Sequence, residues 1–286
     1  MIRILTDSTA DLLPSDLSSL SVRRVPLQVH FGEEHYEDGV DLSPELFYEL
    51  LPQAQKLPTT SQPSPELFLR EFESARDAGD DVVCVLLSSQ LSGTFQSARI
   101  ALADCEYDRV FLVDSQNACL GEQLLVRRAV QRVREGFTAE EIVADLEEAR
   151  SRLRLFALLD TLKYLHKGGR LPAAAAIAGG LLGIKPVITL REGKVAVADK
   201  ARGLPGAYVA IFKEIAKAGG IDERWPVMVG YTGKRHSSEP FVRYVTQNLR
   251  MQTPIVRPIG PVIGVHAGPG AAGIAFFADE PSQTQE

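Results

Sequence analysis

The residues that could carry chemistry gather around a hydroxyl-rich segment, residues 88–94. An unbroken apolar run precedes this segment and indicates a buried strand, while residues 94–103 have the pattern of a helix. A strand that passes into a helix through small residues directs hydroxyls, backbone N–H groups and the positive end of the helix dipole toward one point. The junction therefore suits a carboxylate or a phosphate, although serine and threonine also occur there as ordinary N-caps.

Polar residues recur after other strand-like runs, or in the loops between them, and near the C-terminal end. The five clusters are Asp7-Ser8-Thr9, Thr60-Ser61, Ser92-Gly93-Thr94, Asp114-Ser115 and His266-Ala267-Gly268-Pro269-Gly270. One interpretation is a serine hydrolase with Ser92 as nucleophile, His266 as base, and Asp7 or Asp114 orienting the imidazole. No G-x-S-x-G elbow surrounds Ser92, however, and an aspartate that ends a strand commonly caps the next helix.

A binding site for an amphipathic acid requires less of these residues. Hydroxyls, a backbone N–H and an imidazole would hydrogen-bond the acid headgroup, each bond to a charged group contributing about 1.5–3 kcal/mol. The rest of the ligand would lie in an apolar cavity, which residues 173–184 and 186–190 could line. The same apolar residues are also typical of an ordinary core.

Composition and motifs argue against other classes of function. The net charge of −6 does not favour a nucleic-acid partner, and no apolar run reaches the ~20 residues of a membrane span. Three cysteines in apolar segments and five dispersed histidines predict neither a disulfide framework nor a metal site. The one G-x-G-x-x-G match, Gly268 to Gly273, precedes a strand-like run rather than a helix, so it does not indicate a dinucleotide site. We expect a cytoplasmic protein.

The elements that must position these clusters divide into two groups. Up to residue 160, short apolar strands alternate with helices, which predicts a mostly parallel sheet with helices on both faces. Beyond it, a hairpin pattern at 185–197 and strand-like runs at 227–231, 255–259, 262–266 and 273–277 predict an α+β unit with a largely antiparallel sheet. The expected architecture is α/β with two domains, residues 1–160 and 161–286, and the ligand between them.

Seven motifs, in order along the chain, give the sequence a close resemblance to the DegV family. They are Thr6-Asp7-Ser8-Thr9-Ala10-Asp11-Leu12, Thr60-Ser61-Gln62-Pro63-Ser64, Leu91-Ser92-Gly93-Thr94, Val113-Asp114-Ser115, Asp160-Thr161-Leu162-Lys163-Tyr164-Leu165 with Lys167-Gly168-Gly169-Arg170, Ile184-Lys185-Pro186-Val187, and His266-Ala267-Gly268-Pro269-Gly270. The resemblance covers essentially the whole chain.

This resemblance implies a non-enzymatic bacterial protein that binds one fatty acid, such as palmitate, stearate or oleate, and uses no cofactor or metal. The motif positions that match the family's carboxylate site are Thr60 and Ser92, with His266 in the same polar network and Arg170 from the K-G-G-R motif. Ser61 and Gly93 belong to the same motif segments and complete the expected site. The family further implies a partner, a fatty-acid kinase that makes an acyl-phosphate for phospholipid synthesis, at most transient membrane contact, and a monomer. A serine hydrolase and a binding protein for another amphipathic carboxylic acid remain the alternatives.

Overall fold

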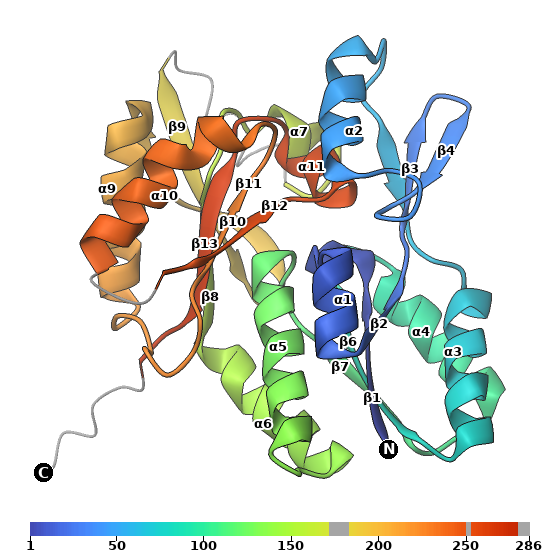
Figure 1. Ribbon diagram of the computed structural model, residues 1–286. Helices are drawn as coiled ribbons and strands as arrows, with labels where there is room; N and C mark the ends of the chain where they lie inside the picture. The colour runs from blue at the N-terminus through green and yellow to red at the C-terminus, as the bar shows by residue number, and fades with distance from the viewer. Residues whose placement is uncertain (172–182, 250–252, 280–286) are drawn as a thin grey trace, which may run out of the picture.

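The computed structural model describes residues 1–171, 183–249 and 253–279. Within these residues two main sheets lie beside each other with helices around them, and a small third sheet stands at one end (Figure 1). The expected α/β architecture, with one parallel sheet and one largely antiparallel sheet, is confirmed.

The first sheet is parallel, and its four strands run in the order β2-β1-β6-β7. Its strands are β1 (Ile2–Asp7), β2 (Val22–Val25), β6 (Asp81–Leu86) and β7 (Val110–Asp114). The helices of this half are α1 (Pro14–Leu20), α3 (Pro65–Ala78), α4 (Thr94–Cys105), α5 (Leu120–Arg134) and α6 (Ala139–Arg152). Two hydrophobic clusters lie on opposite faces of the sheet, one against α5 and α6 and the other against α3 and α4, because parallel strands are buried on both sides.

Local sequence signals set the ends of several helices as expected. Ser43 precedes Pro44 at the start of α2 (Pro44–Leu50), and its hydroxyl accepts a hydrogen bond from the Leu46 N–H at 3.2 Å. At the start of α6, Thr138 and Glu141 bond each other's backbone N–H groups at 3.3 and 2.8 Å. These caps satisfy N–H groups that the first turn of a helix leaves without an intrahelical partner.

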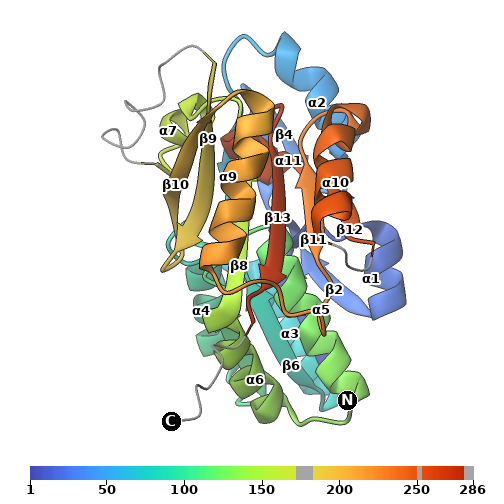
Figure 2. The same cartoon turned by 90° about the vertical axis from the view of Figure 1, so that its left-hand side faces the viewer.

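The second main sheet has six strands in the order β10-β9-β8-β13-β11-β12 and is antiparallel except between β11 and β12. Its strands are β8 (Leu153–Leu158), β9 (Ile184–Arg191), β10 (Lys194–Arg202), β11 (Met228–Tyr231), β12 (Ile255–Pro258) and β13 (Ala272–Phe277). Helices α9 (Gly203–Lys217) and α10 (Arg235–Leu249) cover one face, as Figure 2 shows. The other face packs against α5 of the first half.

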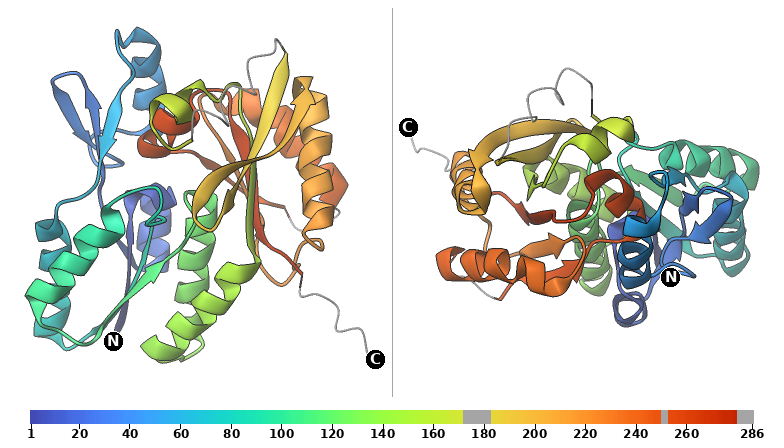
Figure 3. Two further views of the ribbon diagram at one scale, coloured as in Figure 1. Left: turned by 180° about the vertical axis from the view of Figure 1, so that it is seen from behind. Right: turned by 90° about the horizontal axis from the view of Figure 1, so that it is seen from above.

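A smaller group of elements stands over the carboxyl ends of the parallel strands. The small sheet, in the order β4-β3-β5, contains β3 (Gln28–Phe31), β4 (Glu34–Glu37) and β5 (Thr59–Ser61). Helix α2 and the short helices α7 (Lys163–Lys167) and α11 (Pro261–Ala267) lie at the same end of the molecule (Figure 3). Ligands of α/β folds bind outside the carboxyl ends of the strands, so this group is placed to complete a site.

The structure corrects three expectations. The strand expected at residues 153–159 in the first sheet is β8, and it pairs with β13 and β9 of the second. β8 therefore belongs to the second sheet, and the division of the chain at residue 160 stays a prediction. The run 262–266, expected as a strand, belongs to helix α11. Pro261 opens α11, and Gly264 allows close packing, since a Cβ there would lie 2.6 Å from Phe47 Cε1. Residues 59–61, expected in a loop, form β5 against β3.

Candidate functional site

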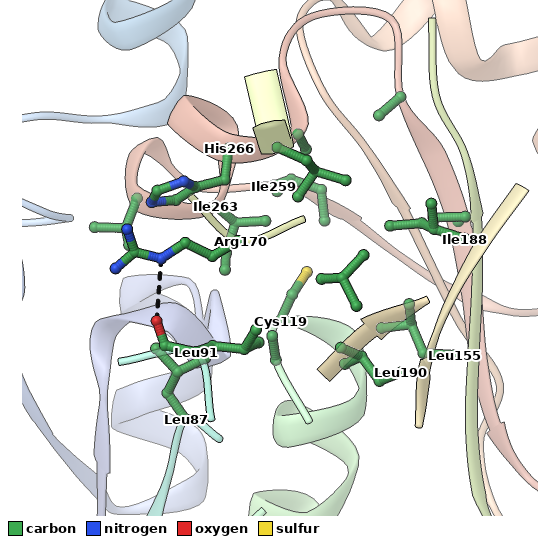
Figure 4. A pocket seen from close by; sticks show the side chains of 18 of the residues that line it. Leu87, Leu91, Cys119, Leu155, Arg170, Ile188, Leu190, Ile259, Ile263 and His266 are labelled. Atoms are coloured by element: carbon green, nitrogen blue, oxygen red, sulfur yellow. Dashed lines mark hydrogen bonds between the residues drawn. The ribbon is translucent and has the colours of Figure 1, made fainter. Parts of the chain in front are cut away.

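A cavity of about 390 Å³ lies between the two halves of the chain, bordered by the second sheet, by α11, by β5 and by the segments that follow β6 and precede α5. Its wall is mainly apolar, as Figure 4 shows for several of its side chains. The labelled apolar residues come from the first half, the second sheet and the segment around α11: Leu87, Leu91, Cys119, Leu155, Ile188, Leu190, Ile259 and Ile263. The expectation that residues 173–184 line the cavity falls almost entirely outside the described residues.

The polar part of the wall contains all six residues that the sequence predicts for a carboxylate site: Thr60, Ser61, Ser92, Gly93, Arg170 and His266. They come from β5, the β6–α4 junction, the turn after α7, and the end of α11. Folding thus brings residues separated by up to 206 positions to one end of one cavity.

Thr60 and His266 form a hydrogen-bonding pair in the polar part of the wall. Thr60 Oγ1 lies 3.0 Å from His266 Nε2. Burial, with a smaller effect from the Arg170 guanidinium, lowers the pKa of His266 to about 4, so the imidazole is neutral at physiological pH. Its Nδ1 is buried and has no hydrogen-bond partner among the described residues, and it lies against Gly168, where a Cβ would be only 2.3 Å away. A neutral imidazole offers one donor and one acceptor. If Nε2 carries the hydrogen, it donates to Thr60, whose own hydroxyl hydrogen then turns to a ligand.

Ser92 also lines the cavity and lies two residues before the start of α4. Its hydroxyl is 2.9 Å from Thr94 Oγ1 and accepts from the Thr94 N–H at 3.3 Å. A side chain at position 93 would displace Gln62, because a Cβ there would lie 1.9 Å from Gln62 Oε1. The Gln62 amide in turn donates to Ser97 Oγ at 2.9 Å. Gln62 also lines the cavity and is a site residue that our sequence analysis named only within a motif.

Arg170 connects the two halves of the chain through hydrogen bonds to the backbone. Its Nε donates to the Leu91 carbonyl at 3.1 Å (Figure 4), and its Nη1 donates to the Gly168 carbonyl at 2.6 Å. Both bonds go to neutral backbone oxygens, so the guanidinium charge is available to the polar end of the cavity.

The residues expected for a hydrolase are not connected as a triad within the described chain. Asp7 accepts hydrogen bonds from Thr9 and from the Leu87 N–H, while Asp114 accepts from Ser89 and the Gln116 N–H. Neither carboxylate has a recorded contact with His266, whose Nε2 is paired with Thr60 rather than Ser92. Both aspartates hold strand–helix junctions in place.

Cys119 lines the cavity. The sequence predicted only a thiol in an apolar segment at this position. Figure 4 shows its sulfur in the middle of the cavity wall. It precedes α5 with φ 54° and ψ −121°, and the following turn is tight, since a Cβ on Gly121 would lie 2.0 Å from Asn117 Oδ1. Burial and the nearby Asp11 raise the pKa of this thiol well above its usual value. A neutral thiol at this place is a poor nucleophile and serves as part of the apolar wall.

Neither a membrane-spanning helix nor a metal-binding cluster is present among the described residues. They contain no helix with both the length and the apolar composition needed to cross a bilayer. Within the same residues no group of three or more histidine, cysteine or acidic side chains is arranged to hold a metal ion.

Comparisons with known proteins identify relatives along the whole chain. A family model described as "Uncharacterised protein, DegV family" matches residues 1–279. A DegV domain-containing protein of Caldanaerobacter subterraneus is 38% identical over 281 residues, covering 96% of this chain and 98% of the relative. Protein DegV of Bacillus subtilis is 30% identical over 282 residues, with the same two coverages.

Solved structures of similar proteins share the fold. A DegV family protein from Thermus thermophilus, whose structure is described as fatty-acid binding, superposes with a TM-score of 0.88 at 35% identity, over 97% of this chain and 99% of that one. A fatty-acid (stearic acid)-binding protein from Eubacterium ventriosum gives a TM-score of 0.88 at 29% identity, over 97% and 98% of the two chains.

Proposed function

This chain belongs to the DegV family, and we propose that it binds one long-chain fatty acid in the cavity between its two halves. The carboxylate lies among Thr60, Ser61, Ser92 and His266, near the Arg170 guanidinium, and the acyl chain lies along the apolar wall. The observation that carries the proposal is one mainly apolar cavity whose wall contains all six predicted residues. A volume of about 390 Å³ lies in the usual range of small-molecule sites.

The chemistry of the wall supports an acid with a long apolar tail. Each methylene removed from water contributes about 0.8 kcal/mol, so the chain supplies most of the affinity. Hydroxyls and one guanidinium at the polar end select a carboxylate over an alcohol or an ester. The resemblance of two structural neighbours described as fatty-acid binding adds independent support.

We further propose that the protein itself does no chemistry and presents the carboxylate to a fatty-acid kinase, which forms the acyl-phosphate. Half-buried Ser92 and Arg170 lie at the polar end, where a partner would reach the headgroup. The neutral His266, paired with Thr60, is suited to hydrogen bonding rather than to general-base catalysis on Ser92.

Two measurements test the binding proposal. Mass spectrometry of the purified, denatured protein should reveal a long-chain fatty acid, and ligand-free protein should take up added palmitate. Ser92→Ala should weaken palmitate binding by about 10- to 150-fold, the equivalent of one hydrogen bond to a charged group. Ser89→Ala is the matched control, because the Ser89 hydroxyl donates to Asp114 at 2.5 Å, outside the cavity lining. Absence of both native ligand and palmitate uptake would refute fatty-acid binding.

The alternatives predict different outcomes. A serine hydrolase would cleave short acyl esters and lose that activity in Ser92→Ala and in His266→Ala. A protein for another amphipathic acid, such as an isoprenoid carboxylate, would bind that acid in preference to palmitate in a competition experiment. For the kinase partnership, Ser92→Ala should lower acyl-phosphate formation in a reaction that contains the kinase and ATP, and unchanged turnover would show that Ser92 has no part in presentation.

A further inference from the structure

Two histidines outside the cavity lie against each other on the small sheet. His30 of β3 and His35 of β4 are cross-strand partners. Their Nδ1 atoms are 2.6 Å apart, and their ring centroids are 4.7 Å apart. His35 is exposed and His30 is half-buried. At this distance one of the two Nδ1 atoms carries a hydrogen and donates it to the other.

His30 also reaches the predicted carboxylate site. Its second ring nitrogen, Nε2, lies 2.9 Å from Ser61 Oγ. Ser61 belongs to β5, next to Thr60, and lines the cavity. A continuous chain of hydrogen-bonding groups therefore runs from the solvent through His35, His30 and Ser61 to the polar end of the cavity.

The position of one hydrogen on His30 decides what Ser61 can do. If Nε2 carries no hydrogen, it accepts the Ser61 O–H, and that hydroxyl has no hydrogen to give a ligand. If Nε2 carries a hydrogen, it donates to Ser61 Oγ, and the hydroxyl hydrogen is released. The Ser61 hydroxyl hydrogen can also be donated to Gln28 Oε1, but the distance is long, at 3.5 Å. A ligand carboxylate in place of Gln28 would accept a stronger, charge-assisted hydrogen bond.

We propose, on the basis of the fatty-acid binding proposed above, that His30 is a positioning residue for the ligand: it directs the Ser61 hydroxyl toward the carboxylate, and protonation of His30 strengthens the binding of that carboxylate. A doubly protonated His30 must donate from both nitrogens, to His35 and to Ser61, so only the productive arrangement of Ser61 remains. Its positive charge also lies one hydrogen bond away from Ser61.

The surrounding charges give the pH dependence its sign. Burial, together with the neighbouring His35, lowers the pKa of His30, so the imidazole is mostly neutral at pH 7. Titratable groups on the adjoining elements include Glu37, on the same face of β4 as His35, and His266 on α11. A bound carboxylate adds a negative charge and raises the pKa of His30, so proton uptake accompanies binding. Affinity for the carboxylate should therefore increase as the pH falls from 8 to 6. His266, with a pKa of about 4, stays neutral throughout this range.

The test is the dissociation constant of palmitate at pH 6, 7 and 8. His30→Gln keeps an N–H donor that does not titrate, so it should bind as tightly as the unmodified protein at pH 6 and show a flat profile. His30→Leu removes the donor and should bind about 2- to 10-fold more weakly at pH 6, the effect of one neutral hydrogen bond. In a Ser61→Ala background, His30→Leu should cause no further loss through this bond.

The outcomes separate this inference from the proposed function. If the unmodified protein binds no palmitate at any pH, fatty-acid binding fails and the role of His30 fails with it. If it binds, and His30→Gln keeps the same pH dependence, or His30→Leu weakens binding equally with and without Ser61, the role of His30 is overturned while fatty-acid binding stands. Thermal melting of each variant identifies any loss that comes from unfolding.

Discussion

Replacing Thr60 with valine tests the polar part of the cavity at the residue whose hydroxyl contacts the buried His266 imidazole. Valine keeps the β-branched shape that suits strand β5 but removes the hydroxyl, which lies 3.0 Å from His266 Nε2. The substitution therefore deletes one hydrogen bond to the ligand and also removes the partner of a buried imidazole.

The two losses have separate magnitudes. A hydrogen bond to a carboxylate is worth about 1.5–3 kcal/mol, which corresponds to a roughly 10- to 150-fold increase in the dissociation constant. Among the described residues His266 Nδ1 has no hydrogen-bond partner, and Thr60→Val leaves Nε2 without its partner as well. A buried polar group left unsatisfied costs about 1–3 kcal/mol of unfolding free energy.

The assay is calorimetric titration of palmitate and of a twelve-carbon acid into the unmodified protein, Thr60→Val and Thr60→Ser, with urea unfolding of each. Thr60→Ser retains the hydroxyl and should stay close to the unmodified protein. Shortening the acid by four methylenes should reduce the binding free energy by about 3 kcal/mol in every variant. The reason is that the headgroup and the acyl chain bind at separate places, so their contributions to the binding free energy add. The reasoning is refuted if Thr60→Val binds palmitate as tightly as Thr60→Ser, or if it changes the dependence on chain length instead of the overall affinity.

Three further substitutions test other parts of the structure. Burial raises the pKa of Asp38 to about 7 from 3.8, so between these values the folded protein holds a proton that the unfolded chain has lost. Its unfolding free energy should fall toward pH 7, with Asp38 contributing about 1.4 kcal/mol per pH unit. Asp38→Asn should remove that contribution in urea unfolding at pH 5, 6 and 7, and parallel curves would contradict it. Cys119 lines the cavity, so palmitate should slow its modification by a small thiol reagent, with Cys119→Ser as control; equal rates with and without palmitate would place the chain elsewhere. Gly93→Ala places a Cβ 1.9 Å from Gln62 Oε1 and should weaken palmitate binding without lowering the melting temperature greatly, whereas unchanged binding would show that Gln62 moves freely.

Features fixed by neighbouring residues were predictable from the sequence. Ser43-Pro44 and Thr138 with Glu141 act within one turn of helix, so their spacing alone specifies a cap. The buried strand before Ser88 and the helix from Thr94 follow from an apolar run and a helical pattern for the same reason.

Features fixed by distant residues were not predictable from local patterns. The sequence of an apolar strand does not specify which strand it pairs with. Nothing within β8 therefore indicates that it belongs to the second sheet, where it pairs with β13. Residues 262–265 of α11 are rich in β-branched side chains, which favour a strand. The same residues form a helix, in which Gly264 packs against Phe47 and Tyr48. The pairing of Thr60 with His266 was expected only from the family resemblance, and the contact of His30 with Ser61 was not expected at all, since both depend on how β3, β5 and α11 meet.

The charge distribution around the cavity decides how affinity and selectivity are divided. The imidazole and the hydroxyls are neutral, and Arg170, the one guanidinium among the described residues that line the cavity, donates to two backbone carbonyls, so a bound headgroup would meet several neutral donors and one nearby positive charge. Ten buried methylenes contribute about 8 kcal/mol, several times the worth of any one headgroup bond. The apolar wall therefore sets how tightly a ligand is held, and the polar end sets which way it points and that it is an acid. A site divided in this way tolerates different chain ends of similar volume and rejects a methyl ester, whose missing charge leaves the buried donors with a weaker acceptor.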